Sequence, residues 1–253
     1  MDRPFLLAHL SDPHVGADWG GPDPAATLAA AVAKVLYIAE PDAVLLSGDL
    51  SDHAADDEYE LVRELVAPLQ APLYVLPGNH DDRGVLRRAF GLPGEGAEPV
   101  RYSADLGPVR LVVVDTTLPG EDPGALDADQ LAWLDAELAD APRQPTLVAM
   151  HHPPVATGVP AWDAIGLNPA DRVALGKVIE RHGQVRRLVG GHVHRVITGD
   201  LAGRPVLAVP STYLQGLLRF GSTELDLAFD EPACVAFHGF FDGELVSHVQ
   251  PVI

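Results

Sequence analysis

The stretch GGHVH, residues 190–194, decides the fold of this chain because it places two histidines at the end of a predicted strand. It directly follows residues 185–189, a short apolar run that predicts a buried strand. Its glycines allow a close backbone approach. On an extended segment, side chains two positions apart point to the same side, so we expect His192 and His194 to face one cavity. The alternatives are a metal site and a turn with two solvent-facing histidines, and this stretch alone leaves both open.

Four further predicted strands run into the same kind of polar residue. They are the apolar segments 5–11, 43–47, 73–76 and 146–150. The residues that follow them can all bind a metal: Asp12, His14, Asp49, Asn79, His80, His151 and His152. Ligands of open α/β sheets bind beyond the carboxyl ends of the strands. If the strands are parallel neighbours, all five motifs therefore meet at one edge of the molecule.

Helical patterns separate these strands. Segments with apolar residues at helical spacing or with helix-start residues are 24–39, 56–69, 127–138 and 168–182. Two more strand candidates lie within 101–117, and residues 195–253 form a β-rich C-terminal part. Strand–helix alternation followed by a β-rich part predicts an α/β protein with two sheets packed face to face and helices outside. We expect one domain over residues 1–253, with the metal-binding motifs in 10–194.

Composition restricts the class of protein. The chain has 253 residues, of which 47% are hydrophobic, and no apolar run reaches the ~20 residues of a membrane helix. The start, MDRPFLLAHLSD, has too short an apolar run for a signal peptide. The single cysteine, Cys234, excludes an internal disulfide and is expected to be a small buried side chain. We therefore expect a soluble cytoplasmic protein with no membrane partner.

The net charge of the chain restricts which molecules can be its partners. Acidic residues number 36 and basic residues 17, for a net charge of −19. Such a surface repels polyanions, so we expect no nucleic-acid polymer as a partner and no nuclease activity on DNA. A small anionic substrate stays open, but local positive charge must then be supplied, and bound metal ions are one source.

The donor chemistry favours two metal ions. Carboxylates, one amide and several imidazoles, without sulfur, suit Mn, Fe, Zn or Co, and are too rich in nitrogen for Ca or Mg alone. Seven ligands are too many for one tetrahedral ion and fit two ions that share a carboxylate. Two divalent ions, two aspartates and a bridging hydroxide would leave a charge of about +1 facing a phosphate.

These motifs resemble the five signature blocks of the calcineurin-like metallophosphoesterases, in family order. The blocks are Asp12-x-His14, Gly48-Asp49, Gly78-Asn79-His80-Asp81, His151 and Gly191-His192-Val193-His194. The details are most similar to the class III cyclic-nucleotide phosphodiesterases. The resemblance implies a four-layer α/β/β/α sandwich of two mixed sheets.

The resemblance also implies residue roles. The first of two divalent or mixed-valence metal ions would be held by Asp12, His14, Asp49 and His194. The second would be held by Asp49, Asn79, His151 and His192, so that Asp49 bridges. A metal-bridging hydroxide would attack phosphorus in line, with Asn79 and His80 as catalytic residues at the phosphate and Asp81 orienting His80. His151 is preferred to His152 as the ligand from its place in the block.

The implied function is hydrolysis of small phosphodiesters, most of all 3',5'- or 2',3'-cyclic nucleotides. The alternatives are a glycerophosphodiesterase, a broad-specificity phosphodiesterase or phosphomonoesterase of the same fold, and a metal-binding scaffold without turnover. The sequence leaves open the native metals, a homodimeric state and the role of His152. It leaves open, too, the function of the loops 118–126, 155–168 and 211–222.

Other polar and aromatic residues have simpler interpretations. His9, in a predicted strand, is expected to be a hydrogen-bonded core histidine. Trp162 is expected to pack within its loop, with base stacking as the alternative. Asp115 ends a predicted strand on the same rim and could support the metal ligands from behind.

Overall fold

The computed structural model describes residues 3–253; residues 1–2, with which the expected domain begins, lie outside the described range. One sheet has the strand order β13-β12-β1-β2-β3. Its strands are β1 (Phe5–Leu10), β2 (Ala43–Ser47), β3 (Leu73–Leu76), β12 (Cys234–Phe241) and β13 (Glu244–Pro251). The first three are parallel, and β12 and β13 are antiparallel to their neighbours. The carboxyl ends of β1, β2 and β3 therefore lie at one edge.

The second sheet has the order β4-β5-β6-β7-β9-β8. Its strands are β4 (Tyr102–Asp105), β5 (Arg110–Val113), β6 (Thr146–Ala149), β7 (Val185–Gly190), β8 (Ile197–Leu201) and β9 (Arg204–Ala208). The run β5-β6-β7-β9 is parallel, and β4 and β8 pair antiparallel at the two edges. Both sheets are thus mixed, as the family resemblance implied.

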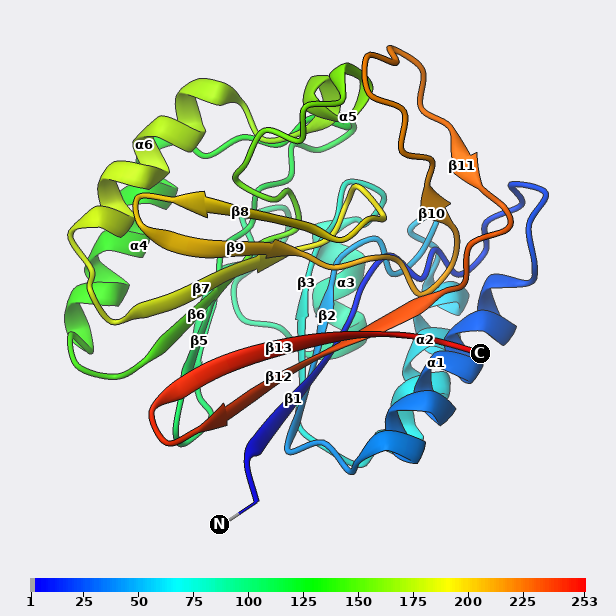
Figure 1. Ribbon diagram of the computed structural model, residues 1–253, viewed down its shortest axis with the longest axis horizontal. Helices are drawn as coiled ribbons and strands as arrows, with labels where there is room; N and C mark the ends of the chain where they lie inside the picture. The colour runs from blue at the N-terminus through cyan, green and yellow to red at the C-terminus, as the bar shows by residue number, and fades with distance from the viewer. Residues whose placement is uncertain (1–2) are drawn as a thin grey trace.

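Helices cover the outer face of each sheet (Figure 1). The first sheet carries α1 (Pro24–Ile38), α2 (Asp56–Val66) with the 3₁₀ turn η1 (Ala67–Leu69), and α3 (Arg83–Phe90). The second carries α4 (Ala128–Asp140) and α6 (Pro169–Glu180). A third apolar cluster lies between the two sheets. The predicted four-layer α/β/β/α sandwich is confirmed.

Alternation along the strands explains these layers. In β2, Val44 and Leu46 pack toward the helices, whereas Ala43 and Leu45 lie in the cluster between the sheets. All five residues of β2 are buried, because each face of the sheet is covered. This is why the strands read in the sequence as continuous apolar runs rather than as alternating patterns.

Two helices and a short pair of strands were absent from the sequence-based prediction. Helix α3 begins after Asp82, whose carboxylate accepts a hydrogen bond from the Val85 N–H, and ends at Gly91 in the left-handed region. It has only eight residues, so its apolar pattern covers too few positions to stand out in the sequence. Helix α5 (Pro160–Ile165) lies within the expected loop 155–168, and β10 (Gln215–Gly216) pairs with β11 (Leu227–Ala228).

Within residues 3–253, none of the helices combines the length and the apolar character needed to span a membrane. Cys234 opens β12 and is half-buried rather than fully buried, so the expectation of a core side chain was wrong. It stands at the first position of its strand, where neighbouring chain covers it only in part. The expectation of one domain over residues 1–253 stays a prediction.

A buried ion pair connects α3 to the end of β5. The Nε atom of Arg83 lies 2.7 Å from Oδ2 of Asp115, and the two side chains are 11% and 0% exposed. Arg83 also donates to the carbonyls of Ala97 and Thr117, and Asp115 accepts from the Val100 N–H. Asp115 therefore holds α3 and the loop after it, rather than supporting a metal ligand directly.

We expect Arg83→Met to destabilise the fold by about 3–5 kcal/mol, because it leaves the Asp115 carboxylate buried without its partner. The free energy of unfolding, measured in urea, checks this. The matched control is Arg88→Met on the same helix, whose 3.5 Å pair with Asp56 is exposed and should contribute little. Equal effects of the two substitutions would contradict the account.

Candidate functional site

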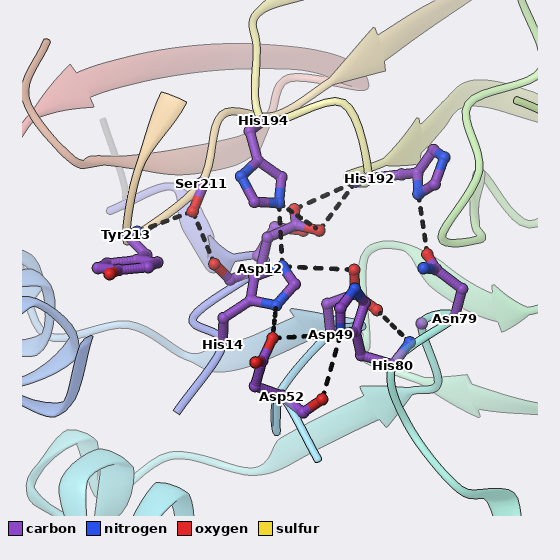
Figure 2. A network of polar contacts seen from close by, with 12 residues as sticks. Asp12, His14, Asp49, Asp52, Asn79, His80, His192, His194, Ser211 and Tyr213 are labelled. Carbon is purple, nitrogen blue, oxygen red and sulfur yellow. Dashed lines mark hydrogen bonds and ion pairs between the residues drawn. The ribbon is translucent and has the colours of Figure 1, made fainter. Parts of the chain in front are cut away.

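The five polar motifs converge where the parallel strands of both sheets end. The loops after β1, β2 and β3 supply aspartate, histidine and asparagine side chains, and the loops after β6 and β7 supply histidines from the facing sheet. Of these side chains, Figure 2 labels Asp12, His14, Asn79, His80, His192 and His194 near Asp49. The convergence expected from the strand order is what the structure shows.

One group of donors brings together the four side chains that the resemblance implied for the first ion. Donor atoms of Asp12, His14, Asp49 and His194 all lie within 4.8 Å of one another. His14 Nε2 is 3.0 Å from His194 Nε2 and 3.4 Å from Asp49 Oδ2. His194 Nε2 is 3.6 Å from Asp12 Oδ1. All four residues are buried.

The donors implied for the second ion lie on the other side of Asp49. Oδ1 of Asn79 is 3.1 Å from His151 Nε2 and 3.0 Å from His192 Nδ1. His151 Nε2 is also 3.3 Å from Asp49 Oδ2. The carboxylate of Asp49 therefore touches both groups, which is the position of a bridging ligand.

The four histidines of these groups share one arrangement of hydrogen bonds. In each, the ring nitrogen that faces away from the centre donates to an oxygen at 2.8–3.1 Å. The pairs are His14 Nδ1 with Asp52 Oδ1, His151 Nδ1 with the Ser47 carbonyl, His192 Nε2 with the Ile165 carbonyl, and His194 Nδ1 with the Leu214 carbonyl. When the ring is neutral, such a bond fixes the tautomer and leaves the inner nitrogen with a free lone pair.

The inner nitrogens fit a metal ion. With its outer nitrogen donating, each neutral imidazole is an acceptor toward the centre, yet His14 Nε2 and His194 Nε2 lie only 3.0 Å apart. Two lone pairs that face each other beside the Asp49 and Asp12 carboxylates cannot form a hydrogen bond, because neither nitrogen carries a proton. A cation between them would satisfy both nitrogens. The donors are oxygen and nitrogen without sulfur, which suits first-row divalent metals. The residues therefore fit a dinuclear divalent metal site.

Burial sets the protonation of most of these groups. It lowers the pKa of His194 to about 4, and it lowers the pKa values of His14 and His192. These imidazoles are then neutral, the form that binds metals. At His151, burial also acts to lower the pKa, but the Asp49 carboxylate outweighs it and raises the pKa to about 9. A divalent ion beside Asp49 would compete with that proton.

The backbone geometry differs from the extended segments expected around the paired ligands. Asp12, His14, Asp49, His192 and His194 all have positive φ, between 44° and 70°. Each paired motif is therefore a turn in the left-handed region, which is strained for residues other than glycine. The side chains of each pair reach the site, but not through strand alternation. The strained geometry is concentrated where the donors are held.

Close backbone approach explains two of the motif glycines. A Cβ added at Gly78 would lie 2.1 Å from Asp49 Oδ1, and one at Gly191 would lie 1.9 Å from Ser11 Oγ. Side chains at these positions would displace the loops that carry Asp49 and Asp12.

His80 lies at the edge of both donor groups, and its side chain is 32% exposed. Its Nδ1 is 3.2 Å from Oδ1 of Asp52, and its backbone N–H donates to Asp49 Oδ1 at 2.9 Å. Burial would lower the pKa of His80, but the Asp49 and Asp52 carboxylates and the Asp52 carbonyl outweigh burial and raise it. His80 is thus suited to donate a proton from Nε2.

Asp81, expected to orient His80, makes other contacts. Its carboxylate accepts from the backbone N–H groups of Leu50 and Gly78 and from the Tyr59 hydroxyl. Burial, with the nearby Asp49, raises its pKa to about 6. It braces the loop behind Asp49, and the residue that contacts the His80 ring is Asp52. The sequence carries Asp52 in the Asp49 block, but nothing in its spacing distinguishes it from Asp81.

Both ring nitrogens of His152 form hydrogen bonds with groups outside the metal-donor groups. Its donor atoms come within 4.8 Å of those of His151 and His192. However, its Nδ1 accepts from the Thr116 hydroxyl at 2.8 Å, and its Nε2 donates to the Asp122 carbonyl at 3.0 Å. No lone pair is then free for a metal, so the geometry favours His151.

We therefore expect His151→Ala to lose one of two bound ions and His152→Ala to keep both. Metal content per chain, measured by plasma mass spectrometry after dialysis, checks this, with circular dichroism as the control for folding. A His152→Ala protein that loses an ion while His151→Ala keeps two would reverse the assignment.

A cavity of about 360 Å³ opens directly onto the donor groups. It is lined in part by His14, Asp49, Asn79 and His80, and in part by two tryptophans, Trp19 and Trp162. Trp162 is 4% exposed and packs in an apolar cluster, as expected. Trp19 was missed, because the loop after the first motif carries no periodic pattern. His9 is buried and contacts His238 at 3.0 Å, so its interpretation as a core histidine is confirmed.

Comparison with known proteins agrees with this geometry. The family model described as calcineurin-like phosphoesterase matches residues 5–196. The glycerophosphodiester phosphodiesterase GpdQ of Enterobacter lignolyticus is 33% identical over 83% of this chain and 78% of its own length. The 3',5'-cyclic adenosine monophosphate phosphodiesterase CpdA of Pseudomonas aeruginosa is 37% identical over 85% of this chain and 78% of its own.

The fold also matches a solved structure. A dimetal phosphatase from Danio rerio superposes with a TM-score of 0.76 and 16% identity, over 100% of this chain and 98% of that one. At this identity the match shows the fold alone.

Proposed function

This chain belongs to the calcineurin-like phosphoesterase family, and from that premise we propose that it hydrolyses small phosphodiesters, cyclic nucleotides first among them. One observation carries the proposal: Asp49 joins two groups of metal donors, and His80 stands beside them at the cavity. A retained His80 and Asn79 favour an enzyme over a metal-binding scaffold.

Two bound divalent ions would supply a water that ionises near neutral pH and positive charge for the phosphate. Asp12, His14, Asp49 and His194 would hold one, and Asp49, Asn79, His151 and His192 the other. We propose Mn, Fe, Zn or Co, as two divalent or a mixed-valence pair, because the donor set combines carboxylates with four imidazoles.

The chain's own residues position the substrate and move a proton. Asn79 turns Oδ1 toward His151 and His192, which leaves its amide NH₂ to donate to a non-bridging phosphate oxygen. His80, held through Nδ1 by Asp52, presents Nε2 to the leaving oxygen and donates its proton as the ester bond breaks. In a cyclic nucleotide the leaving oxygen stays attached to the sugar, so the product is a nucleoside monophosphate.

A glycerophosphodiester is the second candidate substrate. It is favoured by the relative named as a glycerophosphodiester phosphodiesterase, which is 33% identical over 220 residues. Both candidates contain a phosphodiester group with a single negative charge, which would use the same residues. We further propose that the protein acts in the cytoplasm on small substrates, with neither a nucleic-acid polymer nor a membrane as partner.

The experiment that tests the function is a panel of kcat/KM values on the metal-loaded protein. It comprises 3',5'-cAMP, 2',3'-cAMP, glycerophosphocholine and p-nitrophenyl phosphate as a monoester. We expect the diesters to exceed the monoester by at least about tenfold, because the described residues that line the cavity include neither an arginine nor a lysine for a second phosphate charge. A preference for the monoester would contradict the proposal, and no turnover at all would favour the scaffold.

A further inference from the structure

The cavity beside the donor groups has walls that the phosphate chemistry does not use. Its apolar walls come from four separate segments: the loop after β1, the region of α5, the loop after β7, and the arm that carries β10 and β11; Figure 1 labels these elements. The apolar wall residues are Trp19, Trp162, Ile165, Val193, Leu225 and Leu227. A volume of about 360 Å³ is large enough for a bicyclic ring and a sugar next to the phosphate.

The charge of the lining restricts what enters. Among the described residues that line the cavity there is neither an arginine nor a lysine, while Asp122 and Asp226 are present. A second anionic group on the substrate would thus lose its hydration without gaining a partner. The group bound there is therefore uncharged or cationic, with an apolar face.

Trp19 is the wall residue best placed to recognise such a group. It is half-buried, and its indole centroid is 4.4 Å from the His14 ring, 5.6 Å from the Tyr213 ring and 6.1 Å from the His80 ring. It packs against the small cluster of Ala17, Tyr213 and Leu214. A ring held in advance by such contacts loses little freedom when a ligand stacks on it.

We propose that this cavity is a nucleobase subsite and that Trp19 is the specificity-determining residue on which the base stacks. The inference rests on the proposed phosphodiesterase function. It adds that the enzyme recognises the base of its substrate as well as the phosphate. The centroids of the Trp19 and His80 rings are 6.1 Å apart, so a base on Trp19 would lie close enough to a phosphate at His80 for one ribose to join them. Stacking suits the apolar walls, since every base has a π-face.

A cavity lined by tryptophan and carboxylates could also bind a quaternary ammonium group in place of a nucleobase. Such cations are bound by cages of several aromatic rings. Here Trp162 is 4% exposed, so Trp19 is the one tryptophan of the lining with substantial exposed surface. Asp226 is already paired with Arg219 at 3.0 Å. The lining therefore favours a flat neutral base over a cationic headgroup.

The test compares Trp19→Ala and Trp19→Phe with the unsubstituted protein, all metal-loaded. The substrates are 3',5'-cAMP and its base-free analogue, ribose 3',5'-cyclic phosphate. For cAMP we expect Trp19→Ala to lower kcat/KM by about 10- to 100-fold, mostly through KM, the loss typical of one stacked base. Trp19→Phe should recover most of it, and the base-free analogue should change by less than about twofold.

A binding measurement accompanies turnover. Titration with AMP, the expected product, should quench the indole fluorescence of the unsubstituted protein, and Trp19→Phe should remove most of that quenching. An equal loss for cAMP and the base-free analogue would overturn the subsite, as would a larger loss for glycerophosphocholine than for cAMP. If no phosphodiester is hydrolysed, the proposed function fails, and the AMP titration still decides whether a base binds at Trp19.

Discussion

Asp49→Asn is expected to remove nearly all phosphodiesterase turnover, with kcat at least about 100-fold lower, since several kcal/mol of charge stabilisation are lost. The carboxylate oxygen Oδ2 lies 3.4 Å from His14 Nε2 and 3.3 Å from His151 Nε2, so both donor groups depend on it. An amide in its place lacks the negative charge. It would also put an N–H donor or a weaker acceptor where two cations need a shared anionic oxygen.

The measurement is kcat at saturating Mn²⁺ and saturating diester. A matched control is Asp129→Asn, which removes the same charge from a side chain that is 77% exposed on α4 and should leave kcat unchanged. An Asp49→Asn protein that keeps more than about a tenth of the original kcat would contradict the bridging role. Metal content of the same sample should fall below two ions per chain.

His80→Ala has the second largest expected effect, a fall in kcat of about 10²- to 10⁴-fold with a small change in KM. The ring lies at the cavity wall with Nδ1 held by Asp52, and the neighbouring carboxylates raise its pKa despite burial. From this position the ring can donate a proton to the leaving oxygen. Removing the ring leaves an alkoxide to depart without a proton.

Leaving-group dependence separates this role from general damage to the site. For a p-nitrophenyl diester, whose leaving group needs no proton, His80→Ala should lose less activity than it loses for cAMP. His248→Ala, an exposed histidine on β13, is the control and should retain activity. Equal losses for both leaving groups would mean that His80 acts by positioning the phosphate alone.

The strand ends and the order of the motifs were predictable because the last residues of β1, β2, β3, β6 and β7 are all buried. Such strands appear as short apolar runs, and a polar residue at the end of each run is then conspicuous, as at Asp49 and His192. The grouping of donors also followed from the resemblance. The structure places Asp12, His14, Asp49 and His194 together as that grouping required.

Other features depend on tertiary packing that no local pattern encodes. Asp52 and Asp81 both follow motif residues, and only the folded loops show that Asp52 meets His80 while Asp81 braces the backbone. Asp12 and His192 have left-handed backbone conformations, which residues other than glycine rarely adopt, so no sequence pattern indicates them. Trp19 joins the cavity through contacts with Tyr213, which is far along the chain.

The central claim is a pair of metal ions bridged by Asp49, and anomalous diffraction from a Mn²⁺-loaded crystal tests it most directly. We expect two anomalous peaks about 3.5–4 Å apart, one beside Asp12, His14 and His194 and one beside Asn79, His151 and His192. The Asp49 carboxylate should lie between them. A single peak, or a peak coordinated by His152 in place of His151, would contradict the account.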